Sequence, residues 1–333
     1  MDIRNTREIK AFAAQRLSNA REGQKIVLIY SLIVIAVTAL VSAGNYWLSV
    51  QISKTGGLGS MGIRSVLSTA KTLLPIVQLV AVMCLDLGYR SIMLRTARGQ
   101  YASPNGLRLG FDRFWVLLRC ELLKGLIYFG VAMVSVYAAV MIFMITPLSQ
   151  SATDILTPLV TGAAASGQTS LMLDDATYTG LMSAMMPALA ISGVLFLALS
   201  APLFYRYRMT DYILIDRPGT GAAAAMRESR KMMKGNCWKL LRLDVSMWWF
   251  YAAMAIASIV CYGDSILSAL GISLPVSCTA AYFLFFAAYL AVAFAAYYFL
   301  RNRVEVAYAL AYDSLKPREP ETNGAVLGNI FQM

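Results

Sequence analysis

The chain has 333 residues, of which 58% are hydrophobic and only 14% are charged, whereas about a quarter of the residues in ordinary soluble domains are charged. Its mean hydropathy is +0.60, and a soluble fold cannot bury that much apolar surface. The net charge is +11, and there is no histidine, which excludes zinc proteases and Ser-His hydrolases of the standard kind. No Walker A sequence or glycine-rich dinucleotide turn occurs either, so the composition points to a membrane protein without an evident catalytic motif.

Residues 1–25 are predicted to form an N-terminal amphipathic cytoplasmic helix. Ile9, Ala13 and Leu17 repeat at helical spacing, and Gly23 is expected to break the helix just before the first span. At the other end, residues 316–333 contain several turn formers and are predicted to be a disordered cytoplasmic tail.

Between these ends, residues 26–315 are expected to form a membrane domain of six α-helical spans, which makes the fold class an all-α, polytopic membrane protein. The second span is the weakest, because its charge-free core is short and Lys71 must extend to the interface. The connection over residues 146–180 contains no basic residue and is expected to be partly disordered or one short helix. The predicted spans are residues 26–50, 68–90, 122–145, 181–205, 240–262 and 276–300.

The distribution of positive charge predicts the orientation of the spans. All but three of the 29 lysines and arginines fall on one side, and the exceptions are Lys54, Arg64 and Lys71. By the positive-inside rule, both termini then face the cytoplasm. Topology and anionic lipid in the inner leaflet account for the basic excess, so membrane lipids are expected as partners and nucleic acid is not.

The segment from Ala222 to Lys234 is a predicted basic amphipathic helix that lies along the membrane surface. Small or apolar residues follow the i, i+4, i+7 spacing of one helical face, and basic residues occupy the opposite side, as expected of a helix that faces anionic lipid. Gly235 and Asn236 supply the residue types that end helices. The apolar face holds Ala222, Met226, Ser229 and Met233, and the basic face holds Arg227, Arg230, Lys231 and Lys234.

An internal repeat is suggested by two stretches with the pattern W-x-L-L-R-x-acid. One runs from Trp115 to Glu121 and the other from Trp238 to Asp244, and each follows a basic segment and precedes a span. The repeating unit would be one interfacial helix and a two-span hairpin, present three times in the same orientation. The alternative is that every entry into the membrane favours basic residues and tryptophan, which would produce similar junctions without a repeat.

The segment Glu228-Ser-Arg-Lys-Met-Met-Lys-Gly-Asn-Cys-Trp-Lys-Leu240 resembles the bacterial integral membrane proteins grouped as domain of unknown function 975. The earlier stretches Leu87-Gly-Tyr-Arg90 and Gly110-Phe-Asp-Arg-Phe114 are similar to that family as well. The resemblance implies a multi-pass protein of the bacterial plasma membrane and carries over no catalytic residue, because the family has no assigned activity.

The candidate functional residues are charges near span ends: Asp86, Arg90, Glu121, Arg242 and Asp244. Asp86 and Arg90 are four residues apart and are expected to pair on one helix face. Such charges are interpreted as structural interfacial groups, or alternatively as carboxylates in a central cleft that bind a cation or relay a proton.

Three functions are therefore considered. The first is a non-catalytic membrane protein that acts through lipids or an unknown protein partner at the cytoplasmic leaflet. The second is a small-solute or ion transporter or channel built from the three two-span repeats, although the middles of the spans are almost entirely apolar. The third, a membrane-embedded enzyme, lacks a recognisable nucleophile or acid cluster, and no cofactor, metal site or catalytic residue is expected.

Overall fold

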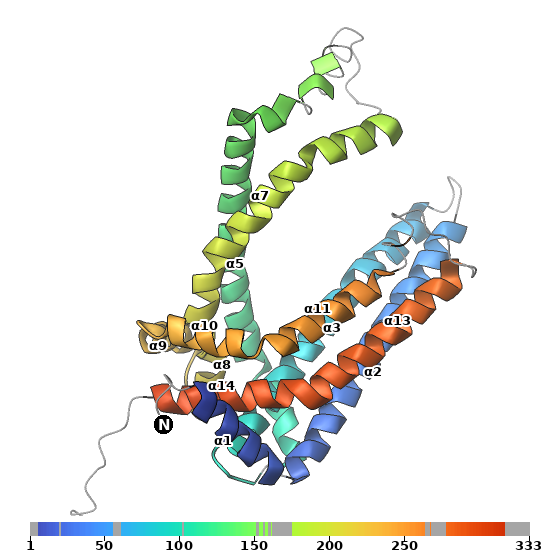
Figure 1. Cartoon of the computed structure of the whole chain (residues 1–333). Coiled ribbons are helices and arrows are strands. Elements are labelled where there is room, and N and C mark those ends of the chain that lie inside the picture. The colour runs from blue at the N-terminus through green and yellow to red at the C-terminus, as the bar shows by residue number, and fades with distance from the viewer. Residues whose placement is uncertain are drawn as a thin grey trace, which may run out of the picture. The chain divides into compact units, whose positions relative to one another are not determined.

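In the computed structural model of the chain, every regular element among the described residues is a helix, which confirms the all-α class (Figure 1). The chain divides into two compact units, one of Met1–Leu118 with Met209–Met333 and the other of Arg119–Arg208. Most of the 146–180 connection, the 263–275 turn and the 316–333 tail lie outside the described residues. The structure describes residues 6–19, 21–55, 61–101, 103–150, 153–155, 157–158, 161, 175–263, 267 and 278–316.

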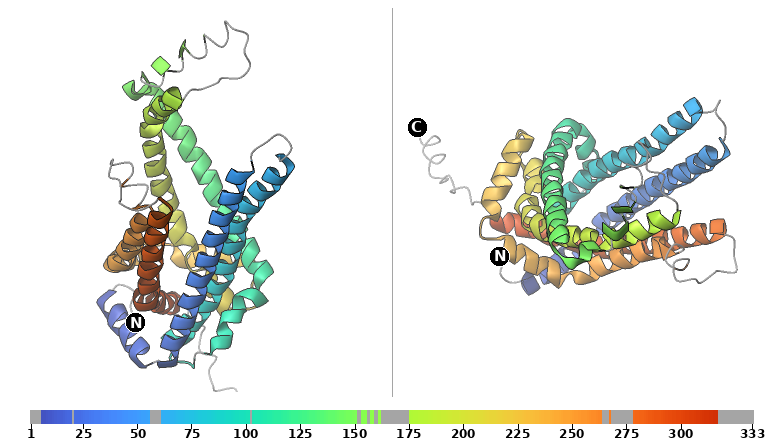
Figure 2. Two further views of the ribbon diagram at one scale, coloured as in Figure 1. Left: turned by 90° about the vertical axis from the view of Figure 1, so that its right-hand side faces the viewer. Right: turned by 90° about the horizontal axis from the view of Figure 1, so that it is seen from above.

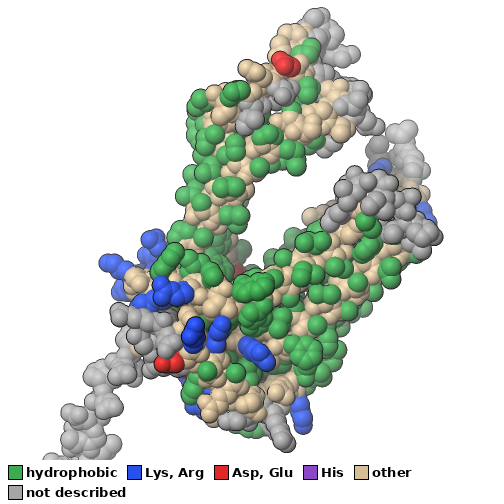
Figure 3. Space-filling view, viewed as in Figure 1, with side chains coloured by type: hydrophobic (Ala, Val, Ile, Leu, Met, Phe, Trp, Pro, Cys, Tyr) green, Lys and Arg blue, Asp and Glu red, His purple; other side chains and the backbone are tan. Residues whose placement is uncertain are grey.

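Five helices are long and apolar enough to cross a membrane, or six if one bent pair counts as a single span. Their outward faces carry large apolar side chains, among them Leu40, Leu79 and Leu197, each about two thirds exposed or more. Soluble proteins rarely expose continuous apolar surface of this extent. Figure 3 shows hydrophobic side chains along the long helices and basic side chains gathered around α9 (Ala222–Met233) and α10 (Cys237–Ser246). These features suggest a multi-pass membrane protein.

Two long helices, α2 (Arg21–Lys54) and α3 (Met61–Ala97), lie side by side in the first unit (Figures 1 and 2). The Gln78 amide donates a hydrogen bond to Thr38 Oγ1 at 3.2 Å between them. The apolar helix α13 (Cys278–Ala295) packs against α11 (Trp248–Cys261) and α2. These helices hold one another mainly through apolar and aromatic contacts, as expected of helices within a bilayer.

The predicted fifth span, residues 240–262, is not one straight helix. The helices α10 and α11 meet at Met247, where the chain bends by 64°. Their compositions explain the bend, because α10 is amphipathic and the charge-free run begins only at Val245. Leu240 and Leu243 are buried, whereas Trp238 is 69% exposed. The first turns of the predicted span therefore belong to a separate amphipathic helix.

The most deeply buried helix of the first unit is α14 (Asn302–Leu315), which continues α13 through a π-helical turn, η4 (Ala296–Arg301). Every residue from Val304 to Tyr312 is buried, although this stretch follows the last predicted span. The helices α3 and α1 (Thr6–Asn19) pack against it. We call the part of the first unit built around α14 its basic end, because most basic residues of this unit lie there.

The N-terminal helix α1 buries its apolar stripe of Ile9, Ala13 and Leu17, and it packs chiefly on α14. The stripe therefore faces protein. Gly23 is not the helix break that the sequence suggested, since α1 ends at Asn19 and Gly23 lies within α2. Helix propensity alone disfavours glycine only weakly, and packing overrides it here.

A short helix at the basic end completes this packing. The helix α8 (Thr210–Asp216) is buried from Thr210 to Leu214 and lies against α3 and α9. The guanidinium of Arg113 donates a hydrogen bond to the Leu214 carbonyl oxygen at 2.7 Å, which ties α8 to the segment that precedes α5 (Phe114–Ile145).

Two glycines allow α3 to approach the segment formed by η2 (Pro104–Arg108) and α4 (Leu109–Asp112). A Cβ atom on Gly88 would lie 2.4 Å from the Leu107 carbonyl oxygen, and one on Gly110 would lie 1.9 Å from the Cys84 carbonyl oxygen. Real Cβ atoms do not come that close to backbone, so only glycine fits either position.

The second unit consists mainly of α5 beyond Leu118 and of α7 (Asp175–Tyr207). The buried side chains of Phe143 and Ala188 pack together between these two helices. Pro187 and Pro202 both lie inside α7.

Candidate functional site

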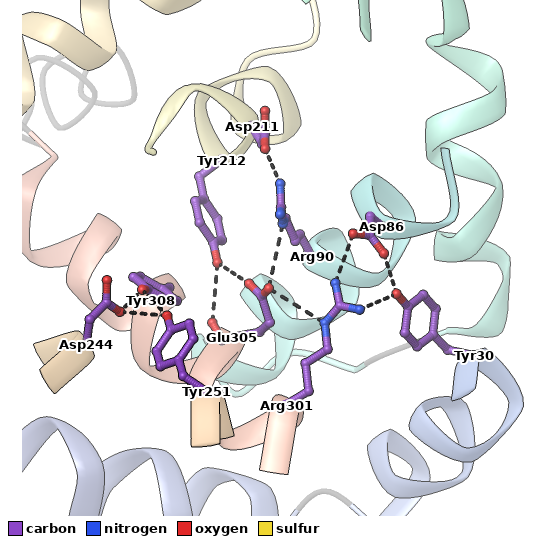
Figure 4. A network of polar contacts seen from close by, with 10 residues as sticks. All are labelled: Tyr30, Asp86, Arg90, Asp211, Tyr212, Asp244, Tyr251, Arg301, Glu305 and Tyr308. Atoms are coloured by element: carbon purple, nitrogen blue, oxygen red, sulfur yellow. Dashed lines mark hydrogen bonds and ion pairs between the residues drawn. The ribbon is translucent and has the colours of Figure 1, made fainter. Parts of the chain in front are cut away.

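Arg301 lies at the centre of a set of polar contacts at the basic end of the first unit (Figure 4). It is the last residue of the π-helical turn η4 and is only 8% exposed. Its Nη1 donates to the Tyr30 hydroxyl at 2.6 Å, and its Nη2 donates to Asp86 Oδ2 at 2.9 Å. The Tyr30 hydroxyl donates to the other oxygen of Asp86. The guanidinium also lies over the rings of Tyr30 and Tyr89, 5.2 and 5.3 Å from their centroids. Arg301 is thus held by charge, hydrogen bonds and aromatic faces together.

Arg90 and Glu305 extend these contacts to α8. Arg90 pairs with Asp211, and its Nε lies 3.8 Å from Glu305 Oε1. Glu305 accepts a hydrogen bond from the Tyr212 hydroxyl at 2.9 Å, and Oε1 lies 3.9 Å from Arg301 Nε. Each acid faces an arginine, so the buried charges largely cancel. We call this set, contributed by α2, α3, α8, η4 and α14, the Arg301 network: Tyr30, Asp86, Arg90, Asp211, Tyr212, Arg301 and Glu305.

A second set of charges joins the ends of α3, α8 and α14. Arg98 donates to Asp216 at 2.8 Å and to both oxygens of Asp313 at 2.7 to 3.2 Å. Lys316 donates to Asp216 at 2.8 Å, and Tyr312 donates to the same oxygen at 3.2 Å. Hydrogen bonds to the Asp313 carboxylate raise the pKa of Arg98 above its ordinary value, so this guanidinium stays charged at any physiological pH.

Asp244 forms a smaller cluster at the bend between α10 and α11. Its Oδ1 accepts hydrogen bonds from the Tyr251 hydroxyl of α11, at 3.1 Å, and from the Tyr308 hydroxyl of α14. The two hydroxyl oxygens lie 3.2 Å apart. One carboxylate therefore links both helices of the bent pair to the central buried helix.

Replacing Tyr308 by phenylalanine removes a donor from the buried Asp244 carboxylate and keeps the ring. We expect the full chain in mild detergent to lose about 1–3 kcal/mol of stability, which would lower the apparent midpoint of thermal unfolding. The matched control is Tyr262→Phe, because Tyr262 is 66% exposed. Equal midpoints for the two variants would show that the hydrogen bond from Tyr308 to Asp244 contributes nothing to stability.

Comparison with known proteins identifies the family. A family model described as "Protein of unknown function (DUF975)" matches residues 1–305. The chain belongs to this family. No curated protein and no solved structure matches it. The matched stretch of this DUF975 protein includes the whole Arg301 network, of which Glu305 is the last residue along the chain.

Within the DUF975 chain, the structure separates the charges proposed from sequence into different environments. Asp86 and Arg90 belong to the Arg301 network, where their ion pairs join different helices. The sequence predicted a pair within one helix and did not predict these interhelical partners. Asp244 is buried in its own cluster, whereas Arg242 is exposed on α10. Glu121 belongs to the second unit, where it pairs with Lys124 at 2.8 Å.

The helix α9 separates its residues into a buried face and an exposed face. Ala222, Met226, Ser229 and Met233 are buried, and α9 packs on α8. The helix ends at Met233, and Gly235 adopts the left-handed conformation with φ of 79°. The exposed positions include all four basic residues proposed from sequence: Arg227, Arg230, Lys231 and Lys234. The apolar face is thus occupied by protein, which leaves the cationic face available.

Sequence reasoning missed the central members of the network. Arg301 was not among the candidate residues, but the structure buries it among Tyr30, Asp86 and Glu305. A signal was present, since Val304 to Tyr312 contains a single charged residue, Glu305, in an otherwise uncharged run. An isolated acid in such a run indicates a buried charge with a partner.

The chemistry open to the Arg301 network is limited by its own contacts. Asp86 and Glu305 face arginine and also accept hydrogen bonds from tyrosine hydroxyls, and Asp211 pairs with Arg90. Carboxylates paired in this way join the helices that carry them. A pocket of about 650 Å³ beside α1 is lined by residues outside this network, such as Phe12 and Leu310.

Proposed function

We propose that this DUF975 protein is a non-catalytic, multi-pass membrane protein that acts through lipid or protein partners at its basic end. Positive-inside asymmetry would place that end at the cytoplasmic leaflet of the bacterial plasma membrane, with both termini in the cytoplasm. The observation that carries the proposal is that the acids of the Arg301 network are occupied by arginine and tyrosine, while the cations of α9 are exposed.

The arrangement that we propose in the bilayer has three helical hairpins. They would be α2 with α3, α5 with α7, and α11 with α13, each preceded by an interfacial segment. Those segments would be α1, η2 with α4, and α9 with α10. Trp115 and Trp238, at equivalent positions of the two W-x-L-L-R-x-acid stretches, are both 69% exposed, which supports similar roles at the interface.

The cationic face of α9 is suited to anionic headgroups because the helix is fixed to protein on its other side. Ser229 and Met233 are buried, and the Arg217–Glu228 ion pair at 2.8 Å ties α9 to the end of α8. Four basic side chains are therefore presented together without any need for the helix to insert. Each cation near an anionic leaflet contributes about 1 kcal/mol to the attraction.

Neutralising this face tests the lipid part of the proposal. In the variant with Arg227→Gln, Arg230→Gln, Lys231→Gln and Lys234→Gln, we expect the excess of phosphatidylglycerol over phosphatidylcholine around the purified protein to fall by at least about tenfold, because four contributions of about 1 kcal/mol are removed. The measurement is quantitative mass spectrometry of lipids retained from nanodiscs of both lipids. The control is the triple variant of Lys54, Arg64 and Lys71 to Gln, all exposed and predicted to lie at the opposite leaflet.

If the α9 variant kept the excess of phosphatidylglycerol, the lipid part of the proposed function would be wrong. Only an interaction with a protein partner would then remain. The transport alternative is tested after reconstitution into sealed vesicles of the same two lipids, with entrapped fluorescent pH and ion indicators. Flux that depends on the wild-type chain and is lost in Asp86→Asn would replace the proposed function by transport.

A further inference from the structure

A second pocket of the first unit lies where α1, α2, η4 and α14 meet, and it has a volume of about 310 Å³. Its polar groups come from Ser18, Gln24, Asn302 and Arg303, and its aromatic wall comes from the neighbouring side chains of Tyr298 and Phe299. No acidic side chain is among the described residues that line it, so the pocket carries the positive charge of Arg303. It therefore combines a cation, amide donors and an apolar wall.

The pocket lies where the apolar runs of two helices end, which is where each helix would leave the hydrocarbon core of a bilayer. Gln24 lies two residues before the charge-free run that begins at Ile26, and Arg303 lies just beyond the run that ends at Leu300. Both boundaries fall at the same pocket, although they are far apart in the sequence. Phe299 is 61% exposed beside it, on the side of the membrane run. Headgroup phosphates lie at this depth in a bilayer.

Arg303 is placed very differently from its neighbour Arg301. Arg301 is buried and paired with Asp86 and Glu305, whereas Arg303 is exposed, and among the described residues no carboxylate pairs with it. The Gln24 side-chain amide likewise has no hydrogen-bond partner within the described part of the chain. A guanidinium and an amide that open on one small pocket match the oxygens of a phosphodiester, and charge-assisted hydrogen bonds of this kind are the strong ones.

We infer that this pocket holds the phosphate of one anionic phospholipid, with Arg303 and Gln24 as its principal ligands and an acyl chain along Tyr298 and Phe299. The inference rests on the proposed function in that the chain is embedded in a bilayer and recognises lipid there. It goes further by naming a single site, separate from the cationic face of α9, and a phosphate ligand.

The test is native mass spectrometry of the full chain after extensive delipidation in mild detergent and addition of phosphatidylglycerol. Wild type should retain one phospholipid. Arg303→Gln should retain about tenfold less, because one charge-assisted hydrogen bond is lost. Ala14→Trp should give the same loss by filling the pocket without changing its charge, since Ala14 is exposed and lines it. Arg242→Gln, which removes an exposed charge away from the pocket, should bind as wild type does.

Three results would overturn the inference. Undiminished retention by both Arg303→Gln and Ala14→Trp would show that the pocket is not the site. An equal loss in Arg242→Gln would show that only overall charge matters. Displacement of the retained lipid by millimolar inorganic phosphate would show a site for free phosphate rather than for lipid. The α9 variant separates this inference from the proposed function, because it should lose the bulk anionic excess while keeping the single retained lipid.

Discussion

Arg301→Met is expected to lower the apparent unfolding midpoint of the full chain in mild detergent by roughly 10 °C, the effect of losing about 3–5 kcal/mol. The substitution replaces the guanidinium and keeps an unbranched apolar stem. It leaves the Asp86 carboxylate in a largely buried position without its Arg301 ion pair, and it removes the cation that lies over the Tyr30 ring. Breaking a buried pair costs more than the pair itself contributes, because a charge remains without compensation.

The matched control is Arg242→Met, which makes the same substitution at an exposed arginine of α10. No carboxylate pairs with Arg242 among the described residues, so its loss should change the midpoint by no more than a surface substitution does. Scan rate and detergent are kept fixed, because unfolding of membrane proteins is often irreversible. If Arg301→Met and Arg242→Met unfolded at the same temperature, Arg301 would not be a structural centre.

Gly110→Ala is expected to be as damaging as loss of Arg301, or to prevent accumulation of folded protein. Its new Cβ would lie 1.9 Å from the Cys84 carbonyl oxygen and 2.6 Å from the carbonyl carbon, both of them backbone atoms of α3. Backbone atoms cannot relieve the contact by a change of rotamer, as a flexible side chain would, so α4 and α3 must separate. Gly88→Ala forces the same separation further along α3, with a contact of 2.4 Å to Leu107. We expect a loss of about 3 kcal/mol or more for each variant.

Gly125→Ala and Gly130→Ala are the controls, because a Cβ at either position of α5 has nothing within 4 Å and alanine is the better helix former. The measurement is the amount of monodisperse protein after detergent extraction, together with its unfolding midpoint. Tolerance of alanine at both Gly88 and Gly110 would mean that η2 and α4 do not pack closely on α3.

The physical basis of these predictions also explains which features of the fold follow from sequence. Apolar runs are local properties, so the long helices were predictable, and helical periodicity separates Ser229 and Met233 from Arg230 and Lys231 on α9. The bend at Met247 was harder to predict, although Arg242 and Asp244 inside a predicted span were a signal of it.

The candidate site was harder to predict, because its partners are set by tertiary packing. Asp86 and Arg90 are one helical turn apart, and the local rule pairs them with each other, but it does not show that Asp86 also pairs with Arg301, 215 residues away. The burial of α14 was missed for a related reason. A charge at the end of an apolar run usually marks the interface, and Arg301 meets that pattern while lying in the protein interior.

The central claim is that charges at the ends of these helices bind one another and thereby join the helices. The most direct test is a double-mutant cycle on Asp86 and Arg301, with Asp86→Asn, Arg301→Met and the double variant unfolded under equilibrium conditions in the same mixed micelles. The account predicts that the double variant is more stable than the sum of the single losses implies, with a coupling of at least about 1 kcal/mol. Strictly additive losses would contradict it, because two residues that do not interact cannot hold α3 to the end of the last apolar helix.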